Sequence, residues 1–362
     1  PVRNVNDPAT GTITVAGSSL QGQVLSAVLG SIQDPDGVPV LQRDASGTPT
    51  NVRFQWQQLR SGADPTLDAS WSAVVGASND RLSLDQSLVG QRLRVLVQYT
   101  DNGGFNETLA STITGSVVNI NDRPEGLPRI SGSPQQGQRL LADTSAIRDA
   151  DGLGAFRYQW LADGKAINGA TQATFTPGQA QVGQRLSLQL AYTDDQGTNE
   201  SLSSEATTSI TNVNDAPVGL PLILGTPSQQ QTLTADLSGI SDADGLDTNR
   251  ISLQWLVDGS PLSGATAPSL RLGQSEVGRS ISLQASYRDG FGSLETVRAL
   301  GTTAVANSND APTGRPLILG TAAVGQILRL DTTTIADADG LGPFSIQWLL
   351  GTQPISTATG ST

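Results

Sequence analysis

A repeat of about 95 residues constrains this chain more than any other feature of its sequence. Asn-Asp followed closely by Pro occurs four times, at Asn6-Asp7, Asn121-Asp122, Asn214-Asp215 and Asn309-Asp310. An Asp-x-Asp-Gly loop begins 27 positions after each of these Asp residues, at Asp34 and Asp36, Asp149 and Asp151, Asp242 and Asp244, and Asp337 and Asp339. Because this offset is constant, the chain is predicted to be a tandem array of one structural unit.

Each repeat carries apolar residues at every second position in two stretches. The first stretch ends in a Gln-Trp pair, at Trp56, Trp160, Trp255 and Trp348. The second ends at a tyrosine in the three longer repeats, at Tyr99, Tyr192 and Tyr287. A period of two predicts half-buried strands, with the Trp and Tyr side chains in the core. Several short strands around one central Trp predict an all-β chain of immunoglobulin-like antiparallel β-sandwich domains.

The repeats also predict the domain boundaries. We expect the end of a preceding repeat at 1–7, a first domain at 8–122, a second at 123–215, a third at 216–310 and a partial fourth at 311–362. The first domain is longer because it has insertions near 38–50 and 60–75. The Asn-Asp-x-Pro links leave almost no flexible linker, which predicts an extended rod. The fourth repeat stops before its Tyr strand, so we expect a longer natural chain or strands supplied by another chain.

Composition restricts the chemistry that the chain can perform. There is no Cys and no His, so thiolate and imidazole ligands are excluded and a metal would need oxygen ligands. Asp and Glu total 33 against 21 Lys and Arg, a net charge of −12 that repels nucleic acid. No apolar run is long enough to predict a membrane span.

Acidic residues recur in a third element of each complete repeat. An Asp-x-x-Gly-x-x-Glu segment begins two residues after the tyrosine, at Asp101 and Glu107, Asp194 and Glu200, and Asp289 and Glu295. In an immunoglobulin-like sandwich, the chain start, the loop before the third strand and the loop before the last strand lie at one end. The three acidic elements should therefore converge where a domain meets its predecessor.

Crowded carboxylates predict a bound cation. Two like charges about 4 Å apart repel by roughly 4 kcal/mol at an effective dielectric near 20, and calcium accepts six to eight oxygens at flexible angles. The predicted calcium ligands are Asn6, Asp7, Asp34, Asp36, Asp101, Glu107, Asn121, Asp122, Asp149, Asp151, Asp194, Glu200, Asn214, Asp215, Asp242, Asp244, Asp289, Glu295, Asn309, Asp310, Asp337 and Asp339. Arg288, which replaces Thr100 and Thr193, is expected to weaken its site. The alternative is that these segments are ordinary Asp-Gly and Asn-Asp turns.

Two further functions compete with that of a spacer. The first-domain insertions could bind a glycan or a protein partner, although loop packing is favoured over a partner surface for Trp71 in the second insertion. A hydrolase with paired carboxylates is disfavoured, because a catalytic pair is normally unique in a chain whereas these pairs recur. Assembly into an extracellular filament or a surface layer is a variant of the spacer hypothesis.

Five segments carry a resemblance to a known family: "NVNDAPVGLPLILGT", "ISDADGL", "LQWLVDG", "VGQRLSLQLAYTDDQGTNE" and "TNVND". They resemble the immunoglobulin-like and cadherin-like tandem repeats of giant bacterial surface adhesins, including RTX adhesins. The resemblance implies the extender region of a cell-surface or secreted protein, whose neighbouring repeats belong to the same longer chain. It also implies that calcium at the domain junctions stiffens this extender, which projects a distal adhesive domain.

Overall fold

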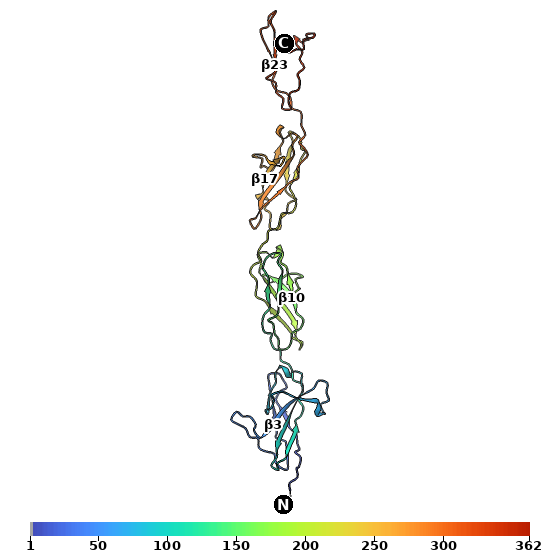
Figure 1. The fold of residues 1–362 in the computed structure, drawn as a ribbon, viewed down its shortest axis with the longest axis vertical. Helices are drawn as coiled ribbons and strands as arrows, with labels where there is room; N and C mark the ends of the chain where they lie inside the picture. Colours follow the sequence, from blue (N-terminus) through green and yellow to red (C-terminus); the bar gives the residue numbers. More distant parts are fainter. Residues whose placement is uncertain (1–2) are drawn as a thin grey trace. The chain divides into compact units, whose positions relative to one another are not determined.

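The computed structural model describes residues 3–362, and among them the chain forms β-strands and short 3-10 helices but no α-helix (Figure 1). The chain divides into a compact unit that ends at Ile210 and a second from Thr211 to Thr362. None of the helices in this described part is long and apolar enough to cross a membrane. All named strand pairs are antiparallel, so the predicted all-β, immunoglobulin-like sandwich class is confirmed.

The first domain packs two sheets around Trp56. The smaller sheet has the order β1 (Thr14–Ala16), β2 (Val24–Val28), β5 (Arg81–Ser83). The larger has the order β4 (Trp71–Ala73), β3 (Val52–Leu59), β6 (Leu93–Thr100), β7 (Asn106–Ala110). Trp56 pairs with Val95 in the register of β3 and β6, and both side chains are fully buried.

The second domain repeats this arrangement with shorter edge strands. Its smaller sheet has the order β12 (Thr174–Phe175), β9 (Leu140–Asp143), β8 (Arg129–Ser131). Its larger sheet has the order β11 (Lys165–Ala166), β10 (Arg157–Ala162), β13 (Leu186–Thr193), β14 (Asn199–Ser203). Trp160 pairs with Leu188 at the position that Trp56 and Val95 occupy in the first domain.

The second unit holds the third and fourth domains. The smaller sheet of the third domain has the order β15 (Leu222–Leu224), β16 (Thr232–Asp236), β19 (Ser269–Arg271). Its larger sheet has the order β18 (Ser260–Pro261), β17 (Ser252–Val257), β20 (Ile281–Arg288), β21 (Leu294–Arg298). In the fourth domain, the strand pairs are β22 (Leu317–Leu319) with β23 (Arg329–Asp331), and β24 (Leu349–Leu350) with β25 (Gln353–Pro354).

Five 3-10 helices of three residues each lie in the connections. They are η1 (Asp68–Ser70), η2 (Gln86–Leu88), η3 (Gln179–Gln181), η4 (Thr248–Arg250) and η5 (Gln274–Glu276). Of these, η2, η3 and η5 each directly precede the Tyr strand of their domain, whereas η1 and η4 occur in one repeat only.

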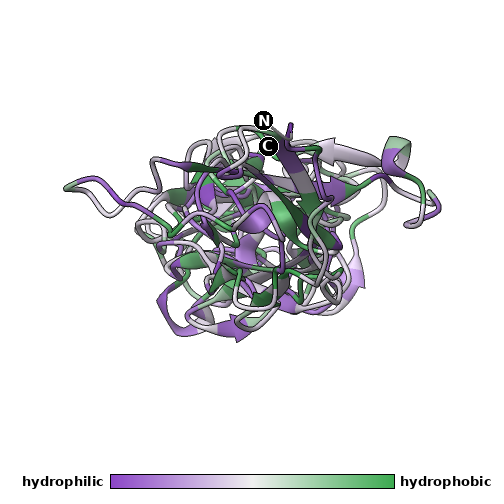
Figure 2. Cartoon of the chain, turned by 90° about the horizontal axis from the view of Figure 1, so that it is seen from below, coloured by the Kyte–Doolittle hydropathy of each residue, from purple (hydrophilic) through white to green (hydrophobic). Residues whose placement is uncertain are grey.

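The alternating sequence pattern accounts for the core. Hydrophobic and hydrophilic residues both occur on the strands (Figure 2), and in β3 every second position from Val52 to Trp56 is buried, at Val52, Phe54 and Trp56. The repeated tryptophans Trp56, Trp160 and Trp255 are fully buried, and each indole Nε1 donates to a backbone carbonyl 2.9 Å away, at Asn79, Gln172 and Ala267. Because a buried indole nitrogen needs an acceptor, these bonds fix the Trp orientation. The prediction that Trp160 and Tyr192 are core residues is confirmed.

The insertions of the first domain project from it as the two blue loops in Figure 1. Trp71 does not lie on their surface, because it is 4% exposed and its Nε1 donates to the Pro65 carbonyl at 3.1 Å. The Arg94 guanidinium lies 4.6 Å from the centre of the Trp71 ring and pairs with Asp68 at 2.9 Å. Trp71 is therefore a packing residue, as the favoured interpretation of loop packing expected, and not part of a partner surface.

Candidate metal centre

The tyrosine strands hold the Asp-x-Asp-Gly loops in all three complete repeats. The tyrosine hydroxyl donates to Oδ2 of the first Asp of the loop, from Tyr99 to Asp34 at 2.8 Å, from Tyr287 to Asp242 at 2.6 Å, and from Tyr192 to Asp149. Burial, followed by this hydrogen bond to a carboxylate, raises the pKa of each tyrosine hydroxyl. The hydroxyls therefore stay protonated and orient the carboxylates.

The loops close on themselves in the same way. Oδ1 of the first Asp accepts the N–H of the second Asp, at 2.9 Å for Asp34, 3.0 Å for Asp149, 2.9 Å for Asp242 and 2.9 Å for Asp337. This is the self-bonded turn in which Asp is favoured. The turn uses one oxygen of the first Asp and leaves the second carboxylate of each loop directed toward the linker.

The linkers reach these loops through their backbone. The N–H of the linker Asp donates to Oδ2 of the second loop Asp, at 2.9 Å for Asp7, 2.6 Å for Asp122, 2.6 Å for Asp215 and 2.7 Å for Asp310. The linker Asn donates from Nδ2 to a glutamate Oε1, from Asn6 to Glu107 at 2.9 Å, from Asn121 to Glu200 at 2.8 Å and from Asn214 to Glu295 at 2.8 Å. In the fourth repeat, Asn309 donates to the Asp310 carbonyl instead. The predicted convergence of the three elements is thus present in each complete repeat.

The linker, the Asp-x-Asp-Gly loop and the loop after the Tyr strand together form an acidic cluster at the start of each domain, which we call its pole. A buried Asp completes the pole of each complete domain. Asp101, Asp194 and Asp289 are 6%, 5% and 7% exposed. Oδ1 of each accepts backbone N–H groups, including those of Phe105 at 2.8 Å, Thr198 at 2.7 Å and Ser293 at 2.8 Å.

The carboxylates come closest together in the first domain. Asp34, Asp36 and Asp101 each offer one oxygen, and these oxygens lie within 4.8 Å of one another. Within residues 3–362 this is the one group of three acidic side chains that meets that spacing. The other predicted sets share the hydrogen-bonding pattern, but their carboxylates lie less close together.

Unpaired oxygens gather at the same poles. Among residues 3–362, ten buried side-chain polar atoms have no hydrogen-bond partner, and all ten are oxygens: those of Asn6, Gln86, Asp101, Asn119, Gln179, Asp194, Asn212, Asp244, Gln274 and Asp289. Buried polar groups are normally paired, and donors and acceptors would both be expected among chance exceptions. A set made only of acceptors fits a cation.

Half of these oxygens come from residues that the sequence analysis missed. Gln86, Gln179 and Gln274 are the first residues of η2, η3 and η5, and Asn119 and Asn212 lie three residues before the linker Asp. Gln86 Nε2 donates to Asp151 Oδ1 at 2.9 Å, so an amide of the first domain reaches the loop of the second. The signal was present in the sequence, because the three Gln residues are 93 and 95 positions apart, like the linkers.

The carboxylates of two linker Asp residues are held by glutamine side chains of the domain before them. Asp122 Oδ2 accepts from Gln21 Nε2 at 2.7 Å, and Asp310 Oδ2 accepts from Gln229 Nε2 at 2.5 Å. The backbone N–H groups of Asp122 and Asp310 face the loops, and the role of their carboxylates as calcium ligands stays a prediction. A buried Gln of the preceding domain holds each side chain.

Hydrogen bonds keep several of these carboxylates ionised. The N–H of Asp7, and then the Asn4 amide, lower the pKa of Asp36. The N–H of Asp310, and then the amides of Asn307 and Gln274, lower the pKa of Asp339. Burial is the largest effect on Asp289 and acts to raise its pKa, but the N–H groups of Ser293 and Phe291 outweigh it, and the net shift is downward.

The donor set of these poles consists of carboxylate and amide oxygens. These are the ligands that calcium prefers, and the mixture of buried Asp, Glu and amide side chains suits its irregular coordination better than the strict octahedron of magnesium. The buried, unpaired oxygens of Asp101, Asp194 and Asp289 are acceptors that such an ion could use.

No protein-family model matches this chain, and no curated protein matches it. Among solved structures, a tetra-tandem repeat from the extending region of a large adhesion protein is 16% identical, with a TM-score of 0.28, covering 83% of this chain and 76% of that chain. A Ca2+-stabilized adhesin with which an Antarctic bacterium binds ice is 11% identical, with a TM-score of 0.28, covering 85% and 77%. The D1–D4 ectodomain fragment of ICAM-5 is 13% identical, with a TM-score of 0.34, covering 81% and 75%.

Proposed function

We propose that this chain is a spacer of an extracellular, cell-surface adhesin, in which calcium at the domain junctions stiffens a row of immunoglobulin-like domains. The observation that carries the proposal is the set of ten buried, unpaired oxygens, all at the poles of the domains. Each such oxygen lacks a donor at a cost of about 1–3 kcal/mol, more when it is charged. A divalent cation at each pole would remove that cost.

Repetition supports a spacer over an enzyme. The Tyr-to-Asp bond and the Asn-to-Glu bond occur in all three complete domains, whereas catalytic carboxylates normally occur once. A spacer needs the same junction several times, because each junction must resist bending.

The junction between the first and second domains shows how an ion would act. Proposed ligands from the second domain are Asp149, Asp151 and Asp194, and the unpaired oxygens of Asn119 and Gln86 come from the linker and the first domain. An ion held by both domains would couple their orientations. Ligands from one domain alone would stabilise that domain without stiffening the junction.

Calorimetric melting and small-angle scattering of the 362-residue chain test this proposal. We expect calcium to raise the melting temperature and the maximum dimension relative to chelator, because the ion binds the native poles and extends the chain. Magnesium at equal concentration is the matched control and should do less. Identical melting and scattering in calcium and in chelator would contradict the proposal.

The first-domain insertions remain a candidate partner surface. Val40 and Val75 are 84% and 99% exposed on them, and Leu67 is 58% exposed. We propose that they contact a protein or glycan, and comparison of a variant lacking 60–70 with the intact chain in a glycan array and a pull-down tests this. Equal binding by both would contradict the role.

A further inference from the structure

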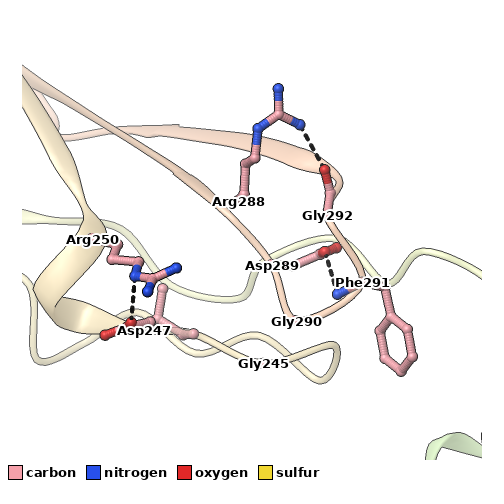
Figure 3. A pocket seen from close by; sticks show the side chains of 9 residues that line it. Gly245, Asp247, Arg250, Arg288, Asp289, Gly290, Phe291 and Gly292 are labelled. Atoms are coloured by element: carbon pink, nitrogen blue, oxygen red, sulfur yellow. Dashed lines mark hydrogen bonds and ion pairs between the residues drawn. The ribbon is translucent and has the colours of Figure 1, made fainter.

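A hollow of about 900 Å³ lies at the pole of the third domain. It separates the loop that ends in η4 from the loop that follows β20, and its walls include Arg250, Arg288 and Phe291 (Figure 3). Its volume is within the range of small-molecule sites. The first two domains have the same two loops, so the differences between repeats explain why the third domain is hollow here.

One missing side chain opens the space. In the first domain, the Asn102 amide covers Gly37, and its Nδ2 is 2.2 Å from where a Cβ on that glycine would lie. In the second domain, Asp195 covers Gly152 in the same way, with Oδ2 at 2.2 Å. The corresponding residue of the third domain is Gly290, which has no side chain to cover the loop glycine.

Two cations have been added around this space. Arg288 stands where the first two repeats have Thr100 and Thr193, and its guanidinium donates one hydrogen bond to the Gly292 carbonyl at 2.7 Å. Arg250 ends a loop that is two residues longer than in the second repeat. Arg250 pairs with Asp247 at 3.3 Å, with the side chains 84% and 49% exposed. Exposed pairs of this kind contribute little and exchange readily for another anion.

An exposed aromatic ring stands at the edge of the hollow. Phe291 is 55% exposed, and the equivalent positions hold Gly103 and Gln196. Figure 3 shows its ring projecting from the loop, while the Asp289 carboxylate turns back to the Phe291 N–H at 2.8 Å. Oδ1 of Asp289 is thus engaged with its own backbone, and Oδ2 is the buried oxygen proposed to face the calcium ion.

We propose that this pocket binds a carboxylated sugar of an acidic oligosaccharide. Arg250 and Arg288 pair with carboxylate oxygens, for which the planar guanidinium is well suited. The Phe291 ring packs against the apolar face of a sugar ring. The pocket goes beyond the spacer function, because all four features occur in the third repeat alone.

Titration of the 362-residue chain with trigalacturonic acid, followed by calorimetry in chelator and in calcium, tests the proposal. We expect saturable binding by the acid and none by its methyl ester, which lacks the charge. Gly290→Asp installs the covering residue of the second domain, and Arg288→Thr installs the residue of both earlier domains. Each should weaken binding about tenfold or more, as expected for loss of the space or of one charge-assisted pair.

Arg139→Gln, in the second domain, is the matched control and should bind like the original chain, and melting temperatures establish that each variant is folded. Equal binding of acid and ester, undiminished binding by folded Gly290→Asp, or no binding at millimolar acid would overturn the pocket. A tri-glutamate peptide that binds as tightly, with the same sensitivity to the variants, would overturn the sugar assignment. Since the sugar titration is also made in chelator, where no calcium is bound, its result is distinguishable from failure of the calcium proposal.

Discussion

The Gln21 side chain donates from Nε2 to Asp122 Oδ2 at 2.7 Å, which ties the end of the first repeat back to its beginning. Gln21 is 9% exposed, and its Oε1 accepts the Ile120 N–H at 3.0 Å. Gln229 makes the same two bonds in the third domain, to Asp310 and to the N–H of Ser308. Since the Asp122 N–H bonds to Asp151, the linker residue is held from both sides.

Gln21→Ala should therefore loosen the first linker whether or not calcium is present. The change removes a side chain that holds a backbone N–H and a carboxylate, so we expect destabilisation of about 1–3 kcal/mol. Limited proteolysis, read by mass spectrometry, should show faster cutting near Asn121 in both chelator and calcium. Gln23→Ala, two residues away at an exposed position, is the control. Equal cutting rates for Gln21→Ala and the original chain would refute this role.

Tyr192→Phe isolates the contribution of the tyrosine hydroxyl to the second acidic pole. The ring is fully buried and packs edge-on against Phe156 with ring centres 5.4 Å apart, so the variant keeps its packing but frees Oδ2 of Asp149. We expect a loss of about 1–3 kcal/mol in chemical denaturation, because the acceptor stays buried without its donor. Calcium affinity should also fall, since the carboxylate is less well oriented. Tyr158→Phe in β10 serves as the comparison, and an equal effect of the two changes would argue against a role for the bond.

Acid should weaken the linker contacts of the chain in chelator. The pKa of Asp36 is lowered in the folded state by the Asp7 N–H and by Asn4. A lowered folded pKa gives stability that is present above the unfolded value, near pH 4, and is lost as the pH falls through the folded value. Melting temperature should therefore drop more steeply below about pH 4 in the original chain than in Asp36→Asn. Parallel acid limbs for the two proteins would show that Asp36 does not contribute.

The strand pattern and the acidic poles could be predicted because both are recorded locally in the sequence. Alternation places Trp56 and Tyr99 in strands, and the offset between Asp7 and Asp34 places loop and linker at one end. The amide contributors were missed. Gln86, Gln179 and Gln274 recur at the spacing of the linkers, but an amide carries no charge that marks it as a ligand, and the distance of Gln86 from Asp151 depends on how two domains meet.

The packing of Trp71 was expected, but its contacts could not be predicted, for a related physical reason. Its insertion folds back on β3, where Leu59 pairs with Trp71 and the Arg94 guanidinium covers the ring. Local sequence records the aromatic residue and its polar neighbours, but the covering cation comes from β6, more than twenty residues later in the chain. The pocket at Gly290 was also missed, since it arises from an absent side chain.

Calorimetric titration of the 362-residue chain with calcium tests the central claim most directly. The account predicts saturable binding below millimolar free calcium, with affinity reduced at one class of sites by Asp151→Asn and also by Gln86→Ala, which carries no charge. The second variant matters because it lies in the first domain, whereas the loop lies in the second. Gln91→Ala is its matched control. No binding at millimolar calcium would contradict the account and return these loops to simple turns.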